Sequence, residues 1–293
     1  MNILITGATG NVGRQIVRYL SEIKSKRNKQ YQVIIADRDI DRAKTTFANV
    51  DNLCYRHFDF DDTESFTQSF EGIDIMFLLR PPQISEVDKY FRPLFDEAKS
   101  TGIRKIVFLS VQGADKSKVI PHNKIELLIK EYEFDYIFVR PSYFMQNLTT
   151  TLLNEIKTKS TITLPSGNAK FNWIDVRDIG NCIAELIMSF DNYSNQAITI
   201  TGEENLDYST AASYLSEELG REIKYRSINP ISFYFLKRKQ GLSSGFAIVM
   251  TILHFLPRLQ GEPEITDNYH KITGERPTSL IEFIARESHM FVH

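Results

Sequence analysis

The chain has 293 residues, of which 42% are hydrophobic and 25% charged, the balance of a globular protein of about two domains. Its 35 basic and 37 acidic residues leave a formal charge of -2 without a basic stripe, which argues against direct nucleic-acid binding. Two cysteines, Cys54 and Cys182, are too few for a disulfide framework or a cysteine-based zinc site. Each lies in an apolar run, so both are expected to be buried thiols in a reducing cytoplasm.

Targeting and membrane signals are weak. The start, MNILITG, has too short an apolar run for a signal peptide and no basic segment before it. The longest apolar stretch, Phe246 to Leu256, is about half of what spans a bilayer, so we predict a buried helix. The charged stretch Lys24 to Lys29 predicts a solvated helix end and loop. We expect a cytoplasmic protein without a membrane partner, and the oligomeric state stays open.

The first two-thirds of the chain alternate strand and helix. Helical spacing occurs at Val12, Ile16 and Leu20, and Gly102 stands where a helix needs a left-handed residue after its end. Uniformly apolar strands indicate a parallel sheet with helices on both faces, so we predict a doubly wound α/β fold. The apolar runs that predict strands are Ile3–Ile5, Val33–Ala36, Leu53–Phe58, Ile73–Leu79, Ile106–Leu109 and Tyr136–Val139.

Beyond about residue 150 the alternation loosens into a helix-rich part. We predict a first domain over 1–155, rejoined by about 172–201, and a smaller domain over 156–293, partly interleaved. Ser279 and Glu282 have capping-box spacing ahead of a last helix. Helices are predicted at Asp178–Phe190, Tyr208–Leu219, Ile231–Lys239, Phe246–Leu256 and Leu280–Ala285, and a strand at Ala197–Ile200.

The strongest motif is a glycine-rich loop between the first strand and the first helix. Gly7 permits a tight turn, Gly10 lets the backbone approach a diphosphate, and Gly13 lets the helix pack closely on the strand. The helix that follows offers unpaired amides and the positive end of its dipole to phosphates. We therefore predict dinucleotide binding, with the contacts made by Gly7, Thr9, Gly10, Asn11, Val12 and Gly13.

The ends of the next strands supply the rest of the predicted cofactor site. Asp37, 24 residues beyond Gly13, can accept hydrogen bonds from a ribose and so favours NAD, whereas Arg38 could pair with a 2′-phosphate and keeps NADP open. Asp59 and Phe60 are placed to contact adenine, or else form a capping loop with a core phenylalanine. Leu79 ends the fourth strand and is also assigned to the cofactor.

On these residues the sequence resembles the short-chain dehydrogenase/reductase superfamily, and more narrowly its atypical NmrA-like branch. The resemblance rests on the loop ITGATGNVGR and on the segments at 59–62, 108–113, 121–126, 139–147 and 173–179. It implies a Rossmann domain that binds NAD or NADP and a small carboxyl-terminal domain. The branch includes reductases of quinones and triphenylmethane dyes, plant isoflavone-reductase-like enzymes, and nucleotide-sensing regulators.

One departure from the superfamily concerns the proton donor. The usual Tyr-x-x-x-Lys motif is absent, because none of the 13 tyrosines has a lysine four positions later. Lys124 could take the lysine's place, but Ile120 then stands where the tyrosine belongs, and isoleucine donates no proton. Sugar-epimerase chemistry is therefore disfavoured.

The candidate catalytic groups lie at strand ends, where open α/β sheets bind ligands. They are Ser110, His122 and Lys124. His122 could donate a proton near neutral pH or could be a satisfied loop histidine; Lys124 could hold the nicotinamide ribose, as could Ser110, or could lie on the surface. His122 and Lys124 compete for the place of the lysine used by isoflavone-reductase-like enzymes. No metal site is predicted.

Three hypotheses follow for function. The first is an NAD(P)H-dependent reductase of a small quinone-like or aromatic acceptor, with the pocket lined by Tyr143, Phe144 and Asn147 and walled by the helix at Phe246–Leu256. The second is a non-catalytic sensor that binds NAD(P) and reports its redox state to a partner. The third is a nucleotide-sugar epimerase-like enzyme.

Overall fold

The computed structural model describes residues 1–27 and 30–292, which form two compact units. Unit 1 consists of Met1–Pro141, Val176–Ile200 and Asn268–Glu275. Unit 2 consists of Ser142–Asp175, Thr201–Asp267 and the chain from Arg276 onward. The charged stretch at 24–29, predicted as a helix end and loop, is helical as far as Arg27, and its last two residues lie outside the described part.

Unit 1 is built on a seven-stranded sheet in which every neighbouring pair is parallel, so the predicted doubly wound Rossmann-type fold is confirmed. The chain runs outward from β1 in both directions, so the strand order reverses between β1 and β4, where such sheets bind ligands. In spatial order the strands are β10 (Gln196–Ile200), β6 (Asp135–Pro141), β5 (Lys105–Leu109), β4 (Ile75–Leu79), β1 (Asn2–Thr6), β2 (Gln32–Asp37) and β3 (Leu53–His57).

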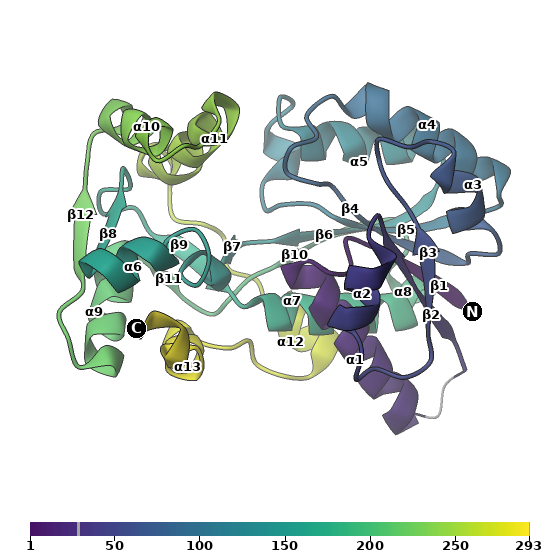
Figure 1. Cartoon of the computed structure of the whole chain (residues 1–293), viewed down its shortest axis with the longest axis horizontal. Helices are drawn as coiled ribbons and strands as arrows, with labels where there is room; N and C mark the ends of the chain where they lie inside the picture. The colour runs from purple at the N-terminus through teal and green to yellow at the C-terminus, as the bar shows by residue number, and fades with distance from the viewer. Residues whose placement is uncertain (28–29, 293) are drawn as a thin grey trace. The chain divides into compact units, whose positions relative to one another are not determined.

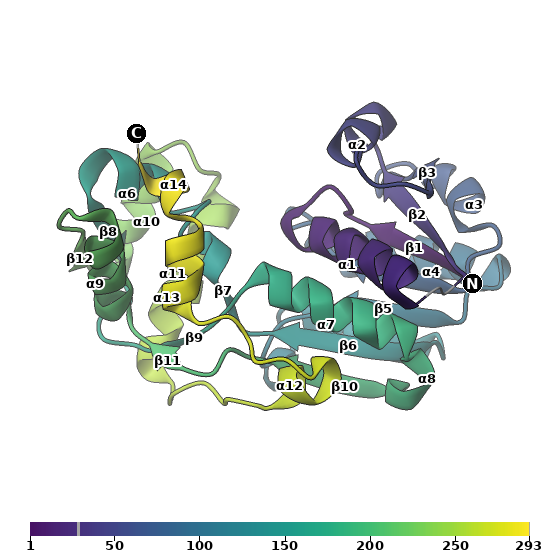
Figure 2. The ribbon, with the colours of Figure 1, turned by 90° about the horizontal axis from the view of Figure 1, so that it is seen from below.

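Helices cover both faces of this sheet (Figure 1). One face carries α3 (Ser65–Phe70), α4 (Val87–Ser100) and α5 (Pro121–Glu131). The other carries α1 (Asn11–Arg27), α7 (Val176–Met188) and α12 (Asn268–Thr273), while α2 (Ile40–Thr46) follows β2 and α8 (Phe190–Tyr193) follows α7. Helices α1 and α7 run side by side (Figure 2), and Gly180 permits this, since a Cβ there would lie 2.3 Å from the Cβ of Gln15.

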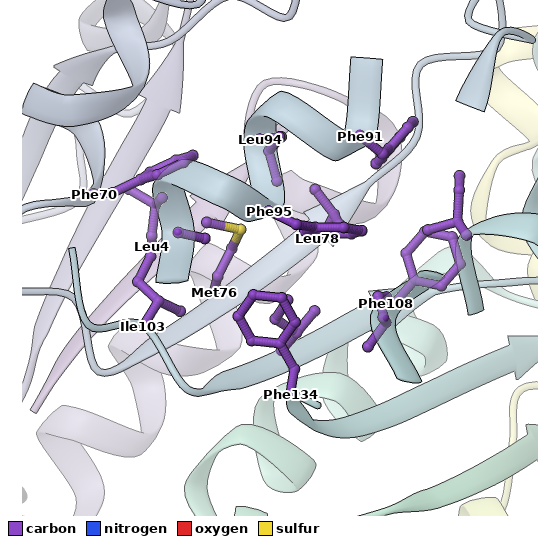
Figure 3. Close-up of a cluster of buried hydrophobic side chains, with 14 of the residues drawn as sticks. Leu4, Phe70, Met76, Leu78, Phe91, Leu94, Phe95, Ile103, Phe108 and Phe134 are labelled. Carbon is purple, nitrogen blue, oxygen red and sulfur yellow. The ribbon is translucent and has the colours of Figure 1, made fainter. Parts of the chain in front are cut away.

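The core between the sheet and α3–α5 is rich in phenylalanine. Strand residues such as Met76 and Leu78 meet Phe91 and Phe95 of α4 there (Figure 3). Burying each such side chain contributes about 1.5–3 kcal/mol to folding. Helix α4 ends as predicted, with Gly102 in the left-handed region at φ 89°.

The two cysteines differ in burial. Cys182 is buried on α7, as expected, but Cys54 is exposed. The prediction for Cys54 is wrong because β3 is an edge strand of the sheet and is only partly covered. The apolar residues in this segment therefore do not imply that the strand is buried on both faces.

Unit 2 contains two small sheets and helices. Three strands pair in the order β11 (Asn205–Leu206), β9 (Phe171–Ile174), β7 (Tyr143–Phe144), and β8 (Thr161–Leu164) pairs in parallel with β12 (Lys224–Ser227). The predicted helix at Tyr208–Leu219 is found with the same bounds, and the capping box of Ser279 and Glu282 is present. The helices are α6 (Leu153–Lys159), α9 (Tyr208–Leu219), α10 (Pro230–Lys239), α11 (Ser244–Phe255), α13 (Leu280–Arg286) and α14 (Ser288–Phe291).

Helix α11 departs from the prediction of a buried helix. Only Ala247, Met250 and His254 are buried; Phe255 is partly exposed, and the other large apolar side chains of the helix are exposed. Apolarity all round a helix indicates that it needs an apolar environment, but it does not say what provides it. Within the described residues, no helix is both long enough and apolar enough to cross a membrane.

Candidate functional site

The glycine-rich loop forms a tight turn between β1 and α1. Gly7 is in the left-handed region at φ 62°, and its carbonyl accepts a hydrogen bond of 3.0 Å from the amide of Gly10. Helix α1 begins at Asn11, and the amide of Arg14 donates to the carbonyl of Gly10 at 3.0 Å. The first amides of a helix lack partners within it, so this turn aims such donors at whatever lies above the loop.

Gly13 fixes how closely α1 approaches the loop. A Cβ on Gly13 would lie 2.3 Å from the carbonyl oxygen of Gly7 and 2.6 Å from Cα of Ala8, distances at which no side chain fits. A Cβ on Gly10 would meet the same carbonyl at 3.2 Å. Backbone packing thus excludes a side chain at Gly13, whereas a Cβ at Gly10 would make a tight contact.

The loop is also held against the end of β4. The hydroxyl of Thr6 donates to the carbonyl of Phe77 at 3.0 Å and accepts from the amide of Leu79 at 3.0 Å. The side chain of Leu79 lies 3.1 Å from the position that a Cβ on Gly7 would occupy. The structure therefore brings Leu79 next to the glycine-rich loop.

Asp37 lies at the end of β2 and is linked to the loop. Its carboxylate accepts hydrogen bonds from the hydroxyl of Thr9 at 2.7 Å and from the amide of Asp39 at 3.0 Å, while the guanidinium of Arg42 lies 3.9 Å away. Asp37 is buried, whereas Arg38 is exposed. The carboxylate that favours NAD is therefore buried and held by hydrogen bonds, whereas the guanidinium of Arg38, which keeps NADP open, is exposed.

Asp59 and Phe60 follow β3. Asp59 forms a turn in which its carboxylate accepts from the amide of Asp61 at 3.1 Å. The ring of Phe60 packs edge-on to Phe58 with centroids 5.0 Å apart, and against Phe91 at 5.5 Å. These contacts are those expected of a capping loop with a phenylalanine packed on the core.

Ser110, at the end of β5, belongs to a buried polar network. Its hydroxyl donates to Glu126 of α5 at 2.5 Å. The same carboxylate takes two hydrogen bonds from Arg140, at 3.0 and 2.6 Å, and Arg140 also lies 3.3 Å from Asp115. The hydrogen bonds that Arg140 donates to Glu126 raise the pKa of Arg140 above its ordinary value. The sequence did not reveal Glu126, because nothing local marks it as the partner of Arg140.

His122 and Lys124 of α5 lie in different environments. Lys124 is exposed. The ring of His122 lies 6.2 Å from that of Phe108, and burial, together with the nearby charge of Arg80, lowers its pKa to about 3. Of the two alternatives left open for His122, this lowered pKa disfavours a proton donor near neutral pH. A neutral imidazole can still donate one hydrogen bond.

Arg80 was not singled out from the sequence. It follows Leu79 at the end of β4, and one guanidinium nitrogen donates to the carbonyls of Pro81, Pro82 and Ile84 at 3.0, 3.2 and 2.6 Å. Its buried Nε has no hydrogen-bond partner among the described residues, and burial lowers the pKa of the side chain. The rule that ligands bind at strand ends, applied to β4, would have found it.

In unit 2, Tyr143 is part of a hydrogen-bonded chain rather than a bare pocket wall. Its hydroxyl accepts from Tyr208 at 2.6 Å and lies 2.8 Å from Nε2 of His254, whose Nδ1 lies 2.8 Å from the carbonyl of Met250. A carbonyl only accepts, so we assign the proton of His254 to Nδ1, and Tyr143 donates to Nε2. Burial raises the pKa of Tyr143 and lowers that of His254 to about 4, so the chain is neutral at pH 7.

The other two residues predicted for the pocket lie close to Tyr143 in sequence. The side-chain amide of Asn147 donates a hydrogen bond to the backbone carbonyl of Phe144 at 3.0 Å, and both side chains are partly exposed. In the described part of the chain, no three His, Cys, Asp or Glu side chains gather as metal ligands would.

The glycine-rich loop lies at the reversal point of the sheet, and comparison with known proteins identifies the family. Residues 1–257 match the NmrA-like family. The chain belongs to the NmrA-like family. Prestalk A differentiation protein A of Dictyostelium discoideum is 29% identical over 283 residues, covering 97% of this chain and 91% of that protein.

Two further relatives carry names that describe activities. An NAD(P)H azoreductase of Xenophilus azovorans is 26% identical over 285 residues and covers 96% of each chain. The structure of the NADPH-dependent quinone oxidoreductase QOR2 of Escherichia coli, complexed with NADPH, superposes with a TM-score of 0.83 at 20% identity over 99% of both chains. At that identity the structural likeness establishes the shared fold.

Proposed function

We propose that the protein is an NAD(P)H-dependent oxidoreductase that reduces a small quinone-like or aromatic acceptor. The observation that carries this proposal is the glycine-rich loop, in which Gly13 leaves no room for a Cβ and α1 begins directly behind Gly10. Such a loop fits the diphosphate of a dinucleotide. The names of the azoreductase and the quinone oxidoreductase support a reductase of this kind.

Unit 1 is proposed as the dinucleotide-binding domain. The loop residues would hold the diphosphate, and Asp37 would accept hydrogen bonds from the adenosine ribose. Leu79 beside Gly7 would contact the cofactor next to the diphosphate. Asp59 and Phe60, which follow β3, are proposed for the adenine, and Ser110 and Lys124 for the nicotinamide ribose. Unit 2 is proposed to carry the acceptor, with Tyr143, Phe144 and Asn147 in contact with it.

The proposed chemistry asks little of the protein beyond orientation. When bound, a reduced nicotinamide supplies the hydride. Ile120 occupies the place of the usual tyrosine, so this chain provides no phenol there. His122 is neutral at pH 7, and its role would be to donate a hydrogen bond to the acceptor oxygen while water supplies the proton.

Asp37 leads us to propose a preference for NAD(H). Its buried carboxylate would oppose a 2′-phosphate, because like charges about 4 Å apart repel by roughly 4 kcal/mol at intermediate dielectric. Arg42, 3.9 Å from that carboxylate, and the exposed Arg38 reduce the repulsion and would let NADP(H) bind more weakly.

Two measurements test the proposal. Calorimetric titration of the full chain with NAD+, NADH, NADP+ and NADPH reports whether a dinucleotide binds. Absorbance at the reduced nicotinamide band, with quinones, azo dyes and triphenylmethane dyes as acceptors, reports turnover. Binding with oxidation of the cofactor by at least one acceptor supports the proposal, and no binding of any of the four forms contradicts it.

The second candidate is a redox sensor without turnover, favoured by the isoleucine at position 120. It requires different affinities for the oxidised and reduced forms, since a ligand with equal affinity for two states shifts no equilibrium. Binding of one form at least tenfold tighter, with no oxidation of NADH or NADPH by any acceptor, would favour the sensor over the reductase.

A further inference from the structure

Beyond Gly245 in its first turn, every exposed side chain of helix α11 is apolar. Its buried residues, Ala247, Met250 and His254, form one stripe at spacings of three and four. The large side chains on the opposite side are all 43% exposed or more: Phe246, Ile248, Val249, Ile252, Leu253, and Leu256 just beyond the helix. The helix contains no charged Lys, Arg, Asp or Glu.

Helix α10 extends this surface. The two helices pack against each other (Figure 1), and α10 exposes Ile231 and Phe235 at a spacing of four residues. We call these two residues, together with the six exposed ones of α11, the α10–α11 apolar face. Contiguous apolar patches of this kind on a protein surface mark interaction sites.

The charged residues of the segment that carries the face have one sign. Every charged residue between 223 and 261 is Lys or Arg, and the acidic residues return only at Glu222 and Glu262. Arg238 and Lys239 are exposed at the end of α10, and Arg258 is exposed just after α11. The whole chain has a net charge of -2, so this basic rim is local.

We propose that the α10–α11 apolar face docks the protein on an anionic lipid surface. An apolar helix face with a basic rim fits a membrane interface, where apolar side chains enter the acyl boundary and Lys and Arg meet lipid phosphates. Helix α11 has 12 residues, too few to span a bilayer, so it would lie in the plane of the interface.

A second copy of the chain fits this face less well. A two-fold contact joins the same patch of both copies and would bring the two basic rims together. Beyond its first turn, the exposed side of α11 also carries none of the polar side chains that fix orientation in protein interfaces. The inference goes beyond the proposed reductase activity and does not depend on it.

Vesicle co-sedimentation of the full chain, without dinucleotide, tests the proposal. We expect the protein to sediment with vesicles in which about a third of the lipid is phosphatidylserine, and at least tenfold less with phosphatidylcholine alone. Salt should weaken the binding, because it screens the basic rim. Sedimentation with neither kind of vesicle overturns the proposal.

Substitutions locate the binding surface. The double variant Val249→Ser, Leu253→Ser should bind anionic vesicles at least tenfold less, whereas Leu127→Ser, which replaces a similarly exposed leucine on α5, should bind as the unchanged protein does. Lys239→Gln should reduce binding about fivefold without touching the apolar face. Because these positions are exposed, thermal unfolding of the variants should match the parent.

Two other occupants would appear in the same experiments and would overturn the proposal. If light scattering shows a dimer that Val249→Ser, Leu253→Ser dissociates, the face belongs to a second copy. If the double variant instead raises the KM of a water-soluble quinone and the parent binds no vesicles, the face is a wall of the acceptor site. A protein that binds vesicles but oxidises no NADH or NADPH supports docking and contradicts only the reductase.

Discussion

The hydroxyl of Thr9, inside the glycine-rich loop, donates a hydrogen bond of 2.7 Å to the carboxylate of Asp37 at the end of β2. The guanidinium of Arg42 in turn donates to the Thr9 hydroxyl at 2.7 Å. This chain ties the loop proposed for the diphosphate to the residue proposed for the ribose. The position of the carboxylate is therefore set before any ligand arrives.

Replacing Asp37 tests the proposed choice of cofactor. Asp37→Ala should weaken NADH binding by about 10- to 100-fold, because hydrogen bonds to a charged group contribute about 1.5–3 kcal/mol. NADPH should lose less, since its 2′-phosphate no longer meets a like charge. Calorimetric titration measures both, with Asp41→Ala as the control, an exposed carboxylate in the first turn of α2. Equal losses for the two cofactors would remove Asp37 from the specificity site.

Replacing Gly10 tests where the diphosphate binds. A Cβ on Gly10 already meets the carbonyl of Gly7 at 3.2 Å, so the branched side chain of Gly10→Val must project over the loop surface. We expect a folded protein, judged by circular dichroism, that has lost dinucleotide binding by at least 100-fold. Gly261→Val, at a glycine with open space around it, should bind as the parent does. Unchanged binding by Gly10→Val would mean that the diphosphate lies elsewhere.

Local signals predicted much of the fold. The positive φ of Gly102 and the capping box of Ser279 and Glu282 each depend on a few neighbouring residues, and such short-range chemistry is readable from sequence. Likewise the run of apolar strands sufficed for a parallel sheet. Burial was harder to predict. The apolar residues around Cys54 and along α11 did not reveal that β3 is an edge strand or that one side of α11 is exposed.

The candidate site was predicted in part for the same reason. The glycine-rich loop is contiguous in sequence, and the sequence located it together with Asp37 and Leu79. The environment of His122 depends on Arg80, a residue on another strand, and that of Ser110 depends on Glu126 and Arg140. Such long-range contacts set protonation states and have no local pattern, so the sequence left both alternatives for His122 open.

The network around Glu126 should matter for stability more than surface ion pairs do. Glu126→Ala leaves Arg140, whose side chain is 12% exposed, without its main partner, and removing one member of a buried pair costs about 3–5 kcal/mol. Glu131→Ala on the same helix breaks an exposed pair with Arg92 and should cost at most about 1 kcal/mol. Urea unfolding of both variants measures the difference. Equal losses would show that the Ser110–Glu126–Arg140 network contributes little.

His254 makes stability depend on pH. Its pKa is about 4 in the folded chain, against about 6.5 for an unfolded histidine, because burial disfavours the charged ring. The unfolded state therefore binds more protons between these values, and stability falls as pH drops below about 6.5, by about 1.4 kcal/mol per pH unit for this residue. His254→Gln should remove that part of the slope in urea unfolding measured from pH 7 to 5. His289→Gln, which removes an exposed histidine of α14, should keep the parent's slope. A slope unchanged by His254→Gln would mean that the ring is charged in the folded protein, and the hydrogen bond from Tyr143 would then have to be reassigned.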